Sequence, residues 1–397
     1  MMPGDAMTVL LFSPMLTVRV IKQAASLSKF ATSVKVYCDD LTRLSLFQTR
    51  FEEYRSLISF GALPNVQKIH RQFPYDPIRN NEMKKILRKN LFNQSVVTII
   101  AHDVFYAYSL IRTIDRLKKE ARNTLFFITD VADNYDLLFD AYENKFKRFV
   151  FKHFIGYLTK KSLKASNQVL VVSPNNKERI GEKYNVKKKD IHVLRNVPFE
   201  VNRLTPEKKN SERNSLVYIG RVDEEARDLE TVVKGLEKLE DWTLHFYSSN
   251  KKTALEQLKK LSKRLKVNKR VFFHEPVSYE NLHSEIAKYT LGVVAHRRNL
   301  LTDFTIPNKL YDYLIAGIPV VASDNPSLVE ESKRLDNVYI YQGENVESFV
   351  NVTKSNRELD FAPIDREKLS WTSEFDGSLG RAVQNLTHTQ IRDANLL

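Results

Sequence analysis

The feature that most constrains the fold is a repeated alternation of short apolar runs with longer amphipathic segments. In the first half of the chain, strands are expected at Thr8 to Phe12, Ser33 to Tyr37, Val96 to Ile100, Leu125 to Ile128 and Gln168 to Val172. Helical spacing follows, as in Val18 to Phe30, where Val20, Ala24 and Leu27 lie three or four positions apart. This alternation predicts a parallel sheet with helices on both faces.

A second series of strands begins after Val197 and Pro198. These strands are expected at Leu216 to Ile219, Thr243 to Tyr247, Val271 to Phe273, Leu291 to Ala295, Pro319 to Ala322 and Val338 to Tyr341. Between the two series, the charged segment Asn202 to Asn214 lacks apolar periodicity and is expected to be a linker or surface loop. We therefore expect an α/β chain of two Rossmann-like, doubly wound domains facing a central cleft, with ligands beyond the carboxyl ends of the strands.

The length of 397 residues exceeds a typical single core and suits two domains. We expect an N-terminal domain at 1–198, a C-terminal domain at 199–370 and a tail at 371–397. The tail contains Trp371 and a moderately helical stretch from Leu379 to Leu386, and it is expected to return to the N-terminal domain.

Composition limits the class of protein and its location. Hydrophobic residues make up 42% and charged residues 28% of the chain, as in soluble globular proteins. No apolar run approaches the roughly 20 residues of a membrane helix, no signal peptide is evident, and Cys38 is the only cysteine, so a cytoplasmic location is expected. The net charge of +14 would suit nucleic acid, an anionic membrane surface or phosphorylated substrates.

The stretch from Thr302 to Asp324 predicts a short helix followed by a buried strand. Within this helix, of about ten residues, Asn308 and Asp312 share one face while Leu310 and Leu314 share another and can pack inward. A helix N-terminus favours phosphate, and a carboxylate farther along can hold a ribose diol. The polar face therefore suits a nucleotide.

The sequence PNKLYDYLIAGIPVV in this stretch resembles the nucleotide-sugar signature of the retaining glycosyltransferases of family 4. The resemblance implies a GT-B fold, a nucleotide-diphosphate sugar as donor substrate, and no separate cofactor or metal. It also implies that Asp312 holds the ribose, while Asn308 and Lys309 lie against the diphosphate. The family often carries a sugar-facing glutamate eight residues before the ribose acid. Here that position is Phe304, with Asp303 beside it as the nearest carboxylate.

A second segment, YIGRVDEEARDLETVVKGL, resembles the part of the family where an arginine and a lysine about five residues later clamp the donor diphosphate. Gly220 would let the backbone turn close to the ligand, and the guanidinium of Arg221 matches phosphate oxygens. Ala226 occupies the spacing of the lysine, and Arg227 follows it as a candidate. The alternative for Arg221 is a surface arginine in a turn.

Two strand ends resemble the acceptor side of the same family. In IIAHDVF, His102 would line the cleft, although a histidine at a strand end equally suits a structural hydrogen bond. In FITDVADNY, Asp130 would face the transferred sugar and stabilise oxocarbenium character, with Asp133 as the alternative in the same loop. Ser173 and the Arg195 to Asn196 segment are expected to position backbone in the cleft.

The segment Lys145 to Lys164, KFKRFVFKHFIGYLTKKSLK, interleaves aromatic and basic residues on an expected helix. Its composition suits peripheral contact with an anionic membrane, and a lipid-linked acceptor would fit such contact. A core helix with a basic outer face fits the sequence equally well.

The function expected from the resemblance is retaining transfer of a sugar to an acceptor hydroxyl in cell-surface glycan or polysaccharide biosynthesis. The alternatives are a nucleotide-sugar epimerase or hydrolase, and a non-catalytic partner subunit of a glycosyltransferase, which the missing glutamate at Phe304 keeps open. A nucleic-acid binder is motivated by the charge alone. The chain has no Walker-type phosphate loop, no H-E-x-x-H and no C-x-x-C, and its nine histidines show no metal-ligand spacing.

Overall fold

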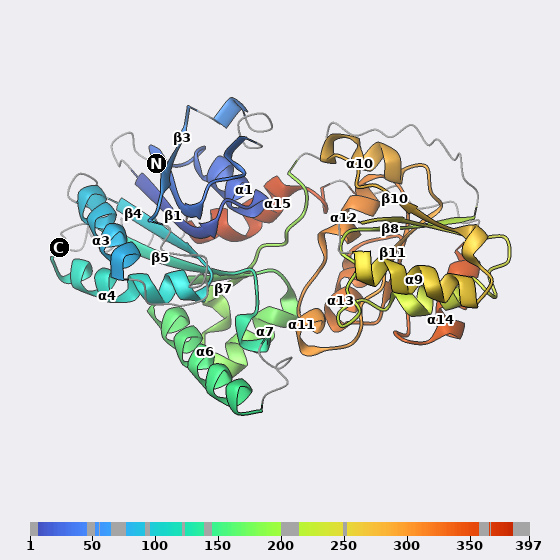
Figure 1. The fold of residues 1–397 in the computed structure, drawn as a ribbon. Coiled ribbons are helices and arrows are strands. Elements are labelled where there is room, and N and C mark those ends of the chain that lie inside the picture. The colour runs from blue at the N-terminus through green and yellow to red at the C-terminus, as the bar shows by residue number, and fades with distance from the viewer. Residues whose placement is uncertain are drawn as a thin grey trace. The chain divides into compact units, whose positions relative to one another are not determined.

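The computed structural model describes residues 7–45, 52–54, 56–64, 77–91, 96–120, 124–138, 145–199, 214–248, 252–356, 365 and 367–383. The chain divides into two compact units. The N-terminal unit takes in Met1–Val172, Asn176–Leu194 and Phe375–Leu397, and the C-terminal unit takes in Ser173–Asn175 and Arg195–Glu374. Apart from Asn214, the expected linker from Asn202 lies outside the described residues. Figure 1 labels the helices and strands of both units.

The N-terminal unit contains a seven-stranded parallel sheet in the order β3-β2-β1-β4-β5-β6-β7. Its strands are β1 (Met7–Met15), β2 (Ser33–Asp40), β3 (Ile58–Ala62), β4 (Val96–His102), β5 (Thr124–Val131), β6 (Gln168–Val171) and β7 (Ile191–Val193). The five strands expected in this half are confirmed, and the edge strands β3 and β7 are additional. β1, at the centre, is buried along most of its length, as expected for a parallel sheet covered on both faces.

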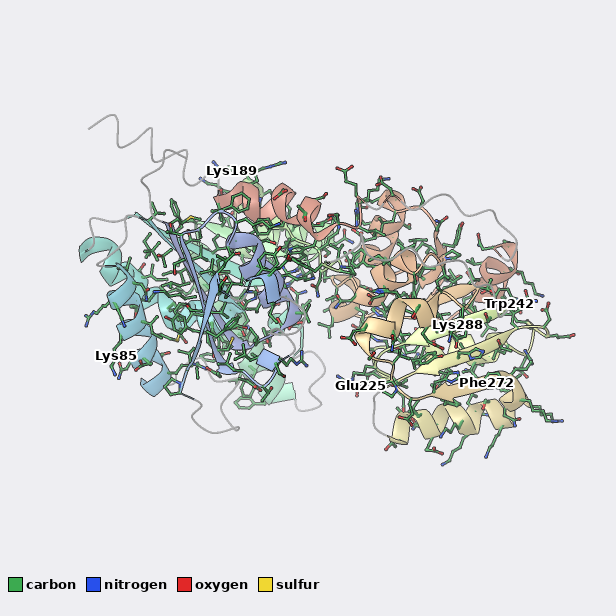
Figure 2. The ribbon with its side chains drawn as sticks, turned by 90° about the horizontal axis from the view of Figure 1, so that it is seen from above. Lys85, Lys189, Glu225, Trp242, Phe272 and Lys288 are labelled. Atoms are coloured by element: carbon green, nitrogen blue, oxygen red, sulfur yellow. The ribbon has the colours of Figure 1, made fainter. Side chains whose placement is uncertain are left out.

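Helices cover this sheet on both sides (Figure 1). They are α1 (Val18–Leu27), α3 (Pro77–Leu91), α4 (Val104–Glu120), α5 (Tyr135–Leu138), α6 (Lys145–Ala165) and α7 (Pro174–Tyr184), with short 3-10 helices at Glu52–Tyr54 and Lys188–Asp190. One core cluster joins Phe12 and Ile99 of the sheet to Leu87 of α3 and Leu110 of α4. Lys85 on the outer side of α3 points away from this core (Figure 2). Among the described residues, no helix is both long and apolar enough to cross a membrane.

The described end of the chain packs on the N-terminal unit. Helix α15 (Trp371–Phe375) is followed by a π-helical turn at Asp376–Gly380, which contacts β7. The rings of Phe30 and Phe375, both in the N-terminal unit, stack with centroids 6.0 Å apart. Of the helical stretch expected at Leu379 to Leu386, the residues from 384 onward lie outside the described part of the chain.

The C-terminal unit contains a six-stranded parallel sheet in the order β10-β9-β8-β11-β12-β13. Its strands are β8 (Ser215–Ile219), β9 (Thr243–Tyr247), β10 (Val271–His274), β11 (Leu291–Val294), β12 (Val320–Ser323) and β13 (Val338–Tyr341). All six strands expected here are confirmed. In Figure 2, Glu225, which follows β8, and Trp242, which precedes β9, mark the two ends of this sheet.

The helices of the C-terminal unit complete its layers. They are α8 (Leu229–Gly235), α9 (Lys252–Arg264), α10 (Tyr279–Ile286), α11 (Leu300–Asp303), α12 (Asn308–Ile315), α13 (Pro326–Arg334) and α14 (Val346–Ser355), with a 3-10 helix at Asn268–Arg270. A single core cluster joins Trp242, Phe246 and Phe349, all 1% exposed or less. The expected α/β architecture of two doubly wound sheets is thus confirmed.

Both sheets reverse their strand order beside their first strand, between β1 and β4 in one unit and between β8 and β11 in the other. In open parallel sheets, ligands bind beyond the carboxyl ends of the strands at this point of reversal. His102 ends β4, and Gly220 follows β8 directly. The topology therefore brings residues expected from the sequence to the two most suitable edges.

Candidate functional site

Helix α12 places the central residues of the C-terminal candidate site. It spans eight residues, Asn308–Ile315, after Pro307 in extended backbone, and it ends before Gly317, whose φ of +81° favours glycine. Leu310 and Leu314 are buried in the core, which fixes the rotation of the helix. From Leu310 to Ile315 every residue is buried, so of the expected polar face only Asn308 is exposed while Asp312 is enclosed.

The carboxylate of Asp312 is held in place by a buried histidine. Its Oδ1 lies 3.1 Å from Nε2 of His283 on α10, and the Asp312 side chain is 11% exposed. With a proton on Nε2, His283 donates to this oxygen. Nothing in the sequence pattern pointed to His283, because a single histidine on an amphipathic helix carries no spacing signal. The contact orients the carboxylate expected to hold the ribose.

The side chain of Lys309 is half-buried, and its Nζ is buried beside Tyr218 of β8. Its Nζ lies 3.6 Å from the ring centroid of Tyr218 and has no hydrogen-bond partner among the described residues. Burial, followed by the charge of Arg227, lowers the pKa of Lys309 well below its usual value. A Cβ at Gly220 would lie 3.5 Å from this Nζ, so the glycine keeps the approach to the ammonium open.

Two further nitrogen-bearing side chains lie at the point where the sheet order reverses. Arg227 and His296 form an antiparallel bridge between the loops that follow β8 and β11. His296 is 1% exposed, and within the described residues neither of its ring nitrogens, nor the buried Nε of Arg227, has a hydrogen-bond partner. Burial, then Arg227 and Lys309, hold the pKa of His296 well below its usual value. His296 was not expected from the sequence.

Arg227, His296 and Lys309 are referred to below as the anion cluster. Buried polar atoms in folded proteins are nearly always hydrogen-bonded, so three neighbouring nitrogen-bearing side chains with buried atoms lacking partners indicate a missing acceptor. Burial, and then the charge of Arg227, lowers the pKa of both His296 and Lys309, so an acceptor with negative charge would suit the cluster. A phosphate meets both requirements.

Arg221 lies apart from the anion cluster. Its guanidinium is 71% exposed and pairs with Asp223 at 3.1 Å, while its carbonyl oxygen accepts a 2.5 Å hydrogen bond from Tyr218. Gly220, just before it, has a φ of +104°, as a tight turn at the strand end requires. Of the two arginines considered in the sequence, Arg227 is therefore the one beside Lys309 and His296.

Asn308 and Asp303 contact neighbouring protein groups. Asn308 Oδ1 accepts a 3.0 Å hydrogen bond from Asn196. Asp303 Oδ1 accepts from Arg298 and from Asn325, each at 2.9 Å, so its carboxylate fixes the turn between α11 and α12. This pairing does not match the sugar-facing position considered for Asp303, because a guanidinium and an amide already occupy the same oxygen.

The residues expected to position backbone also have defined contacts. Ser173 Oγ donates to the carbonyl oxygen of Phe304 at 2.8 Å. Arg195 donates through Nε to Glu331 at 2.6 Å and through Nη1 to Glu374 at 3.3 Å. Both side chains thus anchor segments of the C-terminal unit, to which they belong.

A cavity of about 300 Å³ is lined by Arg227 and by residues of α9. Its lining combines apolar residues with both basic and acidic ones, the charged ones being Arg227, Lys260, Arg264, Arg297, Asp223, Glu224 and Glu230. It shares Arg227 with the anion cluster but includes neither Lys309 nor His296.

In the N-terminal unit, Asp130 is enclosed rather than open to a sugar. It is completely buried and accepts hydrogen bonds from Arg19 at 2.8 and 2.9 Å and from Gln23 at 2.7 Å. Burial alone would raise its pKa, but the charge and hydrogen bonds of Arg19 and the contribution of His102 hold it below the usual value. The expected sugar-facing orientation of Asp130 is therefore not seen, because α1 supplies partners that the sequence did not reveal.

His102 lies at the same edge of the sheet, and its own imidazole is neutral. Its Nδ1 is 3.4 Å from Asp130, and Nε2 is buried without a hydrogen-bond partner among the described residues. Burial lowers the pKa of His102 to about 4, against the opposing effect of Asp130. Nε2 is thus the one ring nitrogen left to meet a bound molecule.

The following residue, Asp103, has an unusual backbone conformation, with a φ of +81°. Its Oδ1 accepts from the amides of Phe105 at 2.8 Å and Tyr106 at 3.0 Å, which caps the start of α4. Burial raises the pKa of Asp103 to about 7 despite these hydrogen bonds. Asp133, exposed in the next loop, also has a raised pKa, through partial desolvation and then through Asp130.

Among the described residues, no group of three or more His, Cys, Asp and Glu side chains is arranged to hold a metal ion.

Comparisons with known proteins agree with this architecture. Residues 213–355, which include the anion cluster and Asp312, match the family model described as glycosyl transferases group 1. No curated protein matches the chain. A glycosyltransferase from Rickettsia africae is similar in structure, with a TM-score of 0.66 and 15% identity over 97% of this chain and 98% of that one.

Two further solved structures are similar to this chain, and their titles name a nucleotide or a nucleotide-sugar. The Anabaena protein HepE, in complex with UDP, has a TM-score of 0.65 and 11% identity over 99% of this chain and 100% of that one. UDP-GlcNAc 2-epimerase from Methanocaldococcus jannaschii has a TM-score of 0.58 and 14% identity over 96% and 99%. At these identities the likeness shows the fold, which is the GT-B arrangement of two Rossmann-like domains. The fold and the match to residues 213–355 together support a GT-B glycosyltransferase with a sugar-transfer function.

Proposed function

We propose that this chain transfers a sugar from a nucleotide-diphosphate sugar to an acceptor hydroxyl. The observation that carries the proposal is the anion cluster, whose buried nitrogens lack partners at the switch point of the second sheet. Asp312 lies three residues after Lys309 on α12, and His283 holds its carboxylate. A diphosphate at the cluster and a ribose at Asp312 would satisfy both sets of groups at once.

The anion cluster also suits the step in which the nucleoside diphosphate leaves the sugar. Negative charge on the diphosphate grows as the bond to the sugar breaks, so preorganised positive groups favour the transition state over the ground state. Lys309 and Arg227 supply these charges, and His296 supplies a ring N–H donor. Because the sites are buried, their interaction with the leaving diphosphate is stronger than it would be in water.

The acceptor is assigned to the N-terminal unit, at the carboxyl edge of its sheet. His102 Nε2 lies at this edge without a partner among the described residues, and Asp103 and Asp133 are carboxyls with raised pKa values. A carboxyl with a pKa of about 7 can accept a proton from an attacking hydroxyl near neutral pH. Retention of configuration and a place in cell-surface glycan synthesis follow from the resemblance to family 4 and are part of the proposal.

A thermal-shift panel of UDP-, GDP-, ADP- and dTDP-sugars tests the donor site. We place UDP-sugars first, because the structurally similar HepE was solved with UDP. A ligand at 100 times its dissociation constant adds about 2.7 kcal/mol to the free energy of unfolding, or a rise of roughly 5 to 10 °C for a domain of this size. The rise should be absent in Asp312→Ala. Failure of every series to stabilise the wild type would contradict the proposal.

A non-catalytic partner subunit is the second candidate. It is favoured by Phe304 at the position of the family glutamate, and by the engagement of Asp303 with Arg298 and Asn325. Release of the free sugar or of the nucleoside diphosphate from the stabilising donor by the purified chain separates the two candidates. Turnover that is lost in Lys309→Ala supports the enzyme, whereas donor binding without turnover supports the subunit.

A further inference from the structure

Helix α6 presents a row of large apolar side chains to solvent. Among the described residues, six of the eleven exposed large hydrophobic side chains lie on this helix: Phe146 at 75% exposed, Phe149 at 61%, Val150 at 44%, Phe151 at 36%, Phe154 at 40% and Tyr157 at 51%. Monomeric soluble proteins rarely gather apolar side chains in this way, and such patches mark interaction surfaces.

The exposure follows from the way α6 is anchored. Its inner face carries Ile155, Leu158 and Leu163, which are buried in the core cluster shared with β6 and α7. On that side, Ser162 Oγ also donates to the carbonyl oxygen of Val104 at 2.9 Å. These contacts fix the rotation of the helix, so the aromatic side cannot turn inward.

Five of these six side chains fall on one stripe of the helix, and Phe151 lies outside it. Relative to Phe146, they recur at three, four, eight and eleven residues, at Phe149, Val150, Phe154 and Tyr157. This spacing keeps the side chains on one face over about three turns. The stripe is thus a continuous apolar ridge and not a scatter of single side chains.

The charge of α6 is of one sign. Residues 145–165 contain six lysines and one arginine and no acidic residue. Lys160, Lys161 and Lys164 are exposed in the turns that follow the apolar ridge, and Lys161 Nζ lies 5.7 Å from the ring centroid of Tyr157. An apolar ridge bordered by lysines matches the two layers of an anionic lipid surface, acyl chains below and phosphates above.

We propose that α6 docks the N-terminal unit on an anionic membrane surface. Phe146, Phe149 and Phe154 enter the boundary between headgroups and acyl chains, and Lys160 and Lys164 contact lipid phosphates. Pairing of this face with the same face of a second copy is disfavoured, because each α6 carries the same excess of positive charge. The proposal stands whether or not the chain transfers sugar.

Vesicle co-sedimentation of the whole chain tests the proposal. The vesicles are phosphatidylcholine, with or without about one third phosphatidylglycerol, since surface potential sets the attraction of lysines. We expect binding to the anionic vesicles alone. Each of Lys160→Glu and Phe149→Ser should weaken it by at least about fivefold, the fold-change that corresponds to one lysine near an anionic surface. The matched controls are Lys189→Glu and Leu57→Ser, exposed side chains of the same unit.

A tryptophan probe reports insertion directly. Trp242 and Trp371 are both 1% exposed, so a change of fluorescence in Phe149→Trp on adding vesicles comes from position 149. A blue shift with anionic vesicles supports insertion. The proposal is overturned if the wild type ignores anionic vesicles, if the α6 variants bind as well as the controls do, or if sedimentation shows a dimer that Phe149→Ser dissociates.

Discussion

Lys309 Nζ lies 3.6 Å from the ring centroid of Tyr218, and it has no hydrogen-bond partner among the described residues. A cation–π contact compensates only part of the cost of burying a charge. The site therefore holds a lysine that is costly to keep charged. A bound diphosphate would remove this cost. The unfavourable burial of the ammonium in the ligand-free protein therefore favours binding of the diphosphate.

Replacing Lys309 should stabilise the ligand-free protein. Lys309→Met keeps the aliphatic packing against Tyr218 and removes the buried ammonium, so we expect the free energy of unfolding of the C-terminal unit to rise by about 1 to 3 kcal/mol. The gain should shrink as the pH rises toward 10.5, because in the wild type the lowered pKa costs stability only below the unfolded value. Urea unfolding at pH 7 and pH 10 measures both effects. An unchanged or lower stability of Lys309→Met at pH 7 would contradict this account of the ammonium.

His283 is expected to act through Asp312 and not by contact with the donor. His283→Ala leaves the carboxylate without its 3.1 Å contact, and we expect donor affinity to fall about tenfold, the effect of losing roughly one hydrogen bond to a charged group. His283→Gln can donate from its amide and should recover part of the affinity. Calorimetric titration of the donor distinguishes the variants. Equal affinity in His283→Ala and wild type would show that Asp312 needs no support.

The Arg19 and Asp130 pair should contribute to stability and not to chemistry. Removing one partner of a buried ion pair leaves an uncompensated charge, so Asp130→Ala should lower the free energy of unfolding by about 3 to 5 kcal/mol. The double change with Arg19→Met should cost less than the two single changes added together. Urea unfolding of the three variants checks this. If Asp130→Ala is as stable as the wild type but has lost sugar transfer, Asp130 acts in catalysis and this account is contradicted.

His102 should make the protein sensitive to mild acid. Its folded pKa is about 4, below the unfolded value near 6.5, so the unfolded chain binds the extra proton as the pH falls through this window. Relative to His102→Gln, the wild type should lose on the order of 3 kcal/mol between pH 7 and pH 4. Taking the difference between the two proteins removes the opposite contribution of Asp103, whose pKa is raised. A difference that is independent of pH would show that the imidazole is not buried as a neutral group.

The fold could be predicted from the sequence because the patterns that indicate it are local. Apolar runs such as Leu291 to Ala295, separated by helix-length segments, predict a parallel sheet whatever the rest of the chain does. The rotation of α12 about its axis could also be predicted, since Leu310 and Leu314 must face the core. Edge strands β3 and β7 were missed because short, partly exposed strands differ little from loops in composition.

The candidate site was only partly predictable, because it depends on contacts between distant segments. His283 and His296 are isolated in sequence, and their importance comes from Asp312 and Arg227 across the fold. Spacing alone could not show which of Arg221 and Arg227 lies beside Lys309. The conformation of the turn between the two arginines decides which guanidinium points inward. The partners of Asp130 lie more than 100 residues earlier on α1.

The dissociation constant of the stabilising nucleotide-sugar, measured by titration calorimetry, tests the central claim that the anion cluster holds the donor diphosphate. The proteins to compare are wild type, Lys309→Met, Arg227→Met and Arg221→Met. We expect each cluster variant to bind at least about tenfold more weakly, and Arg221→Met to change binding by less than about threefold, as for an exposed ion pair. Full affinity in Lys309→Met and Arg227→Met would contradict the account.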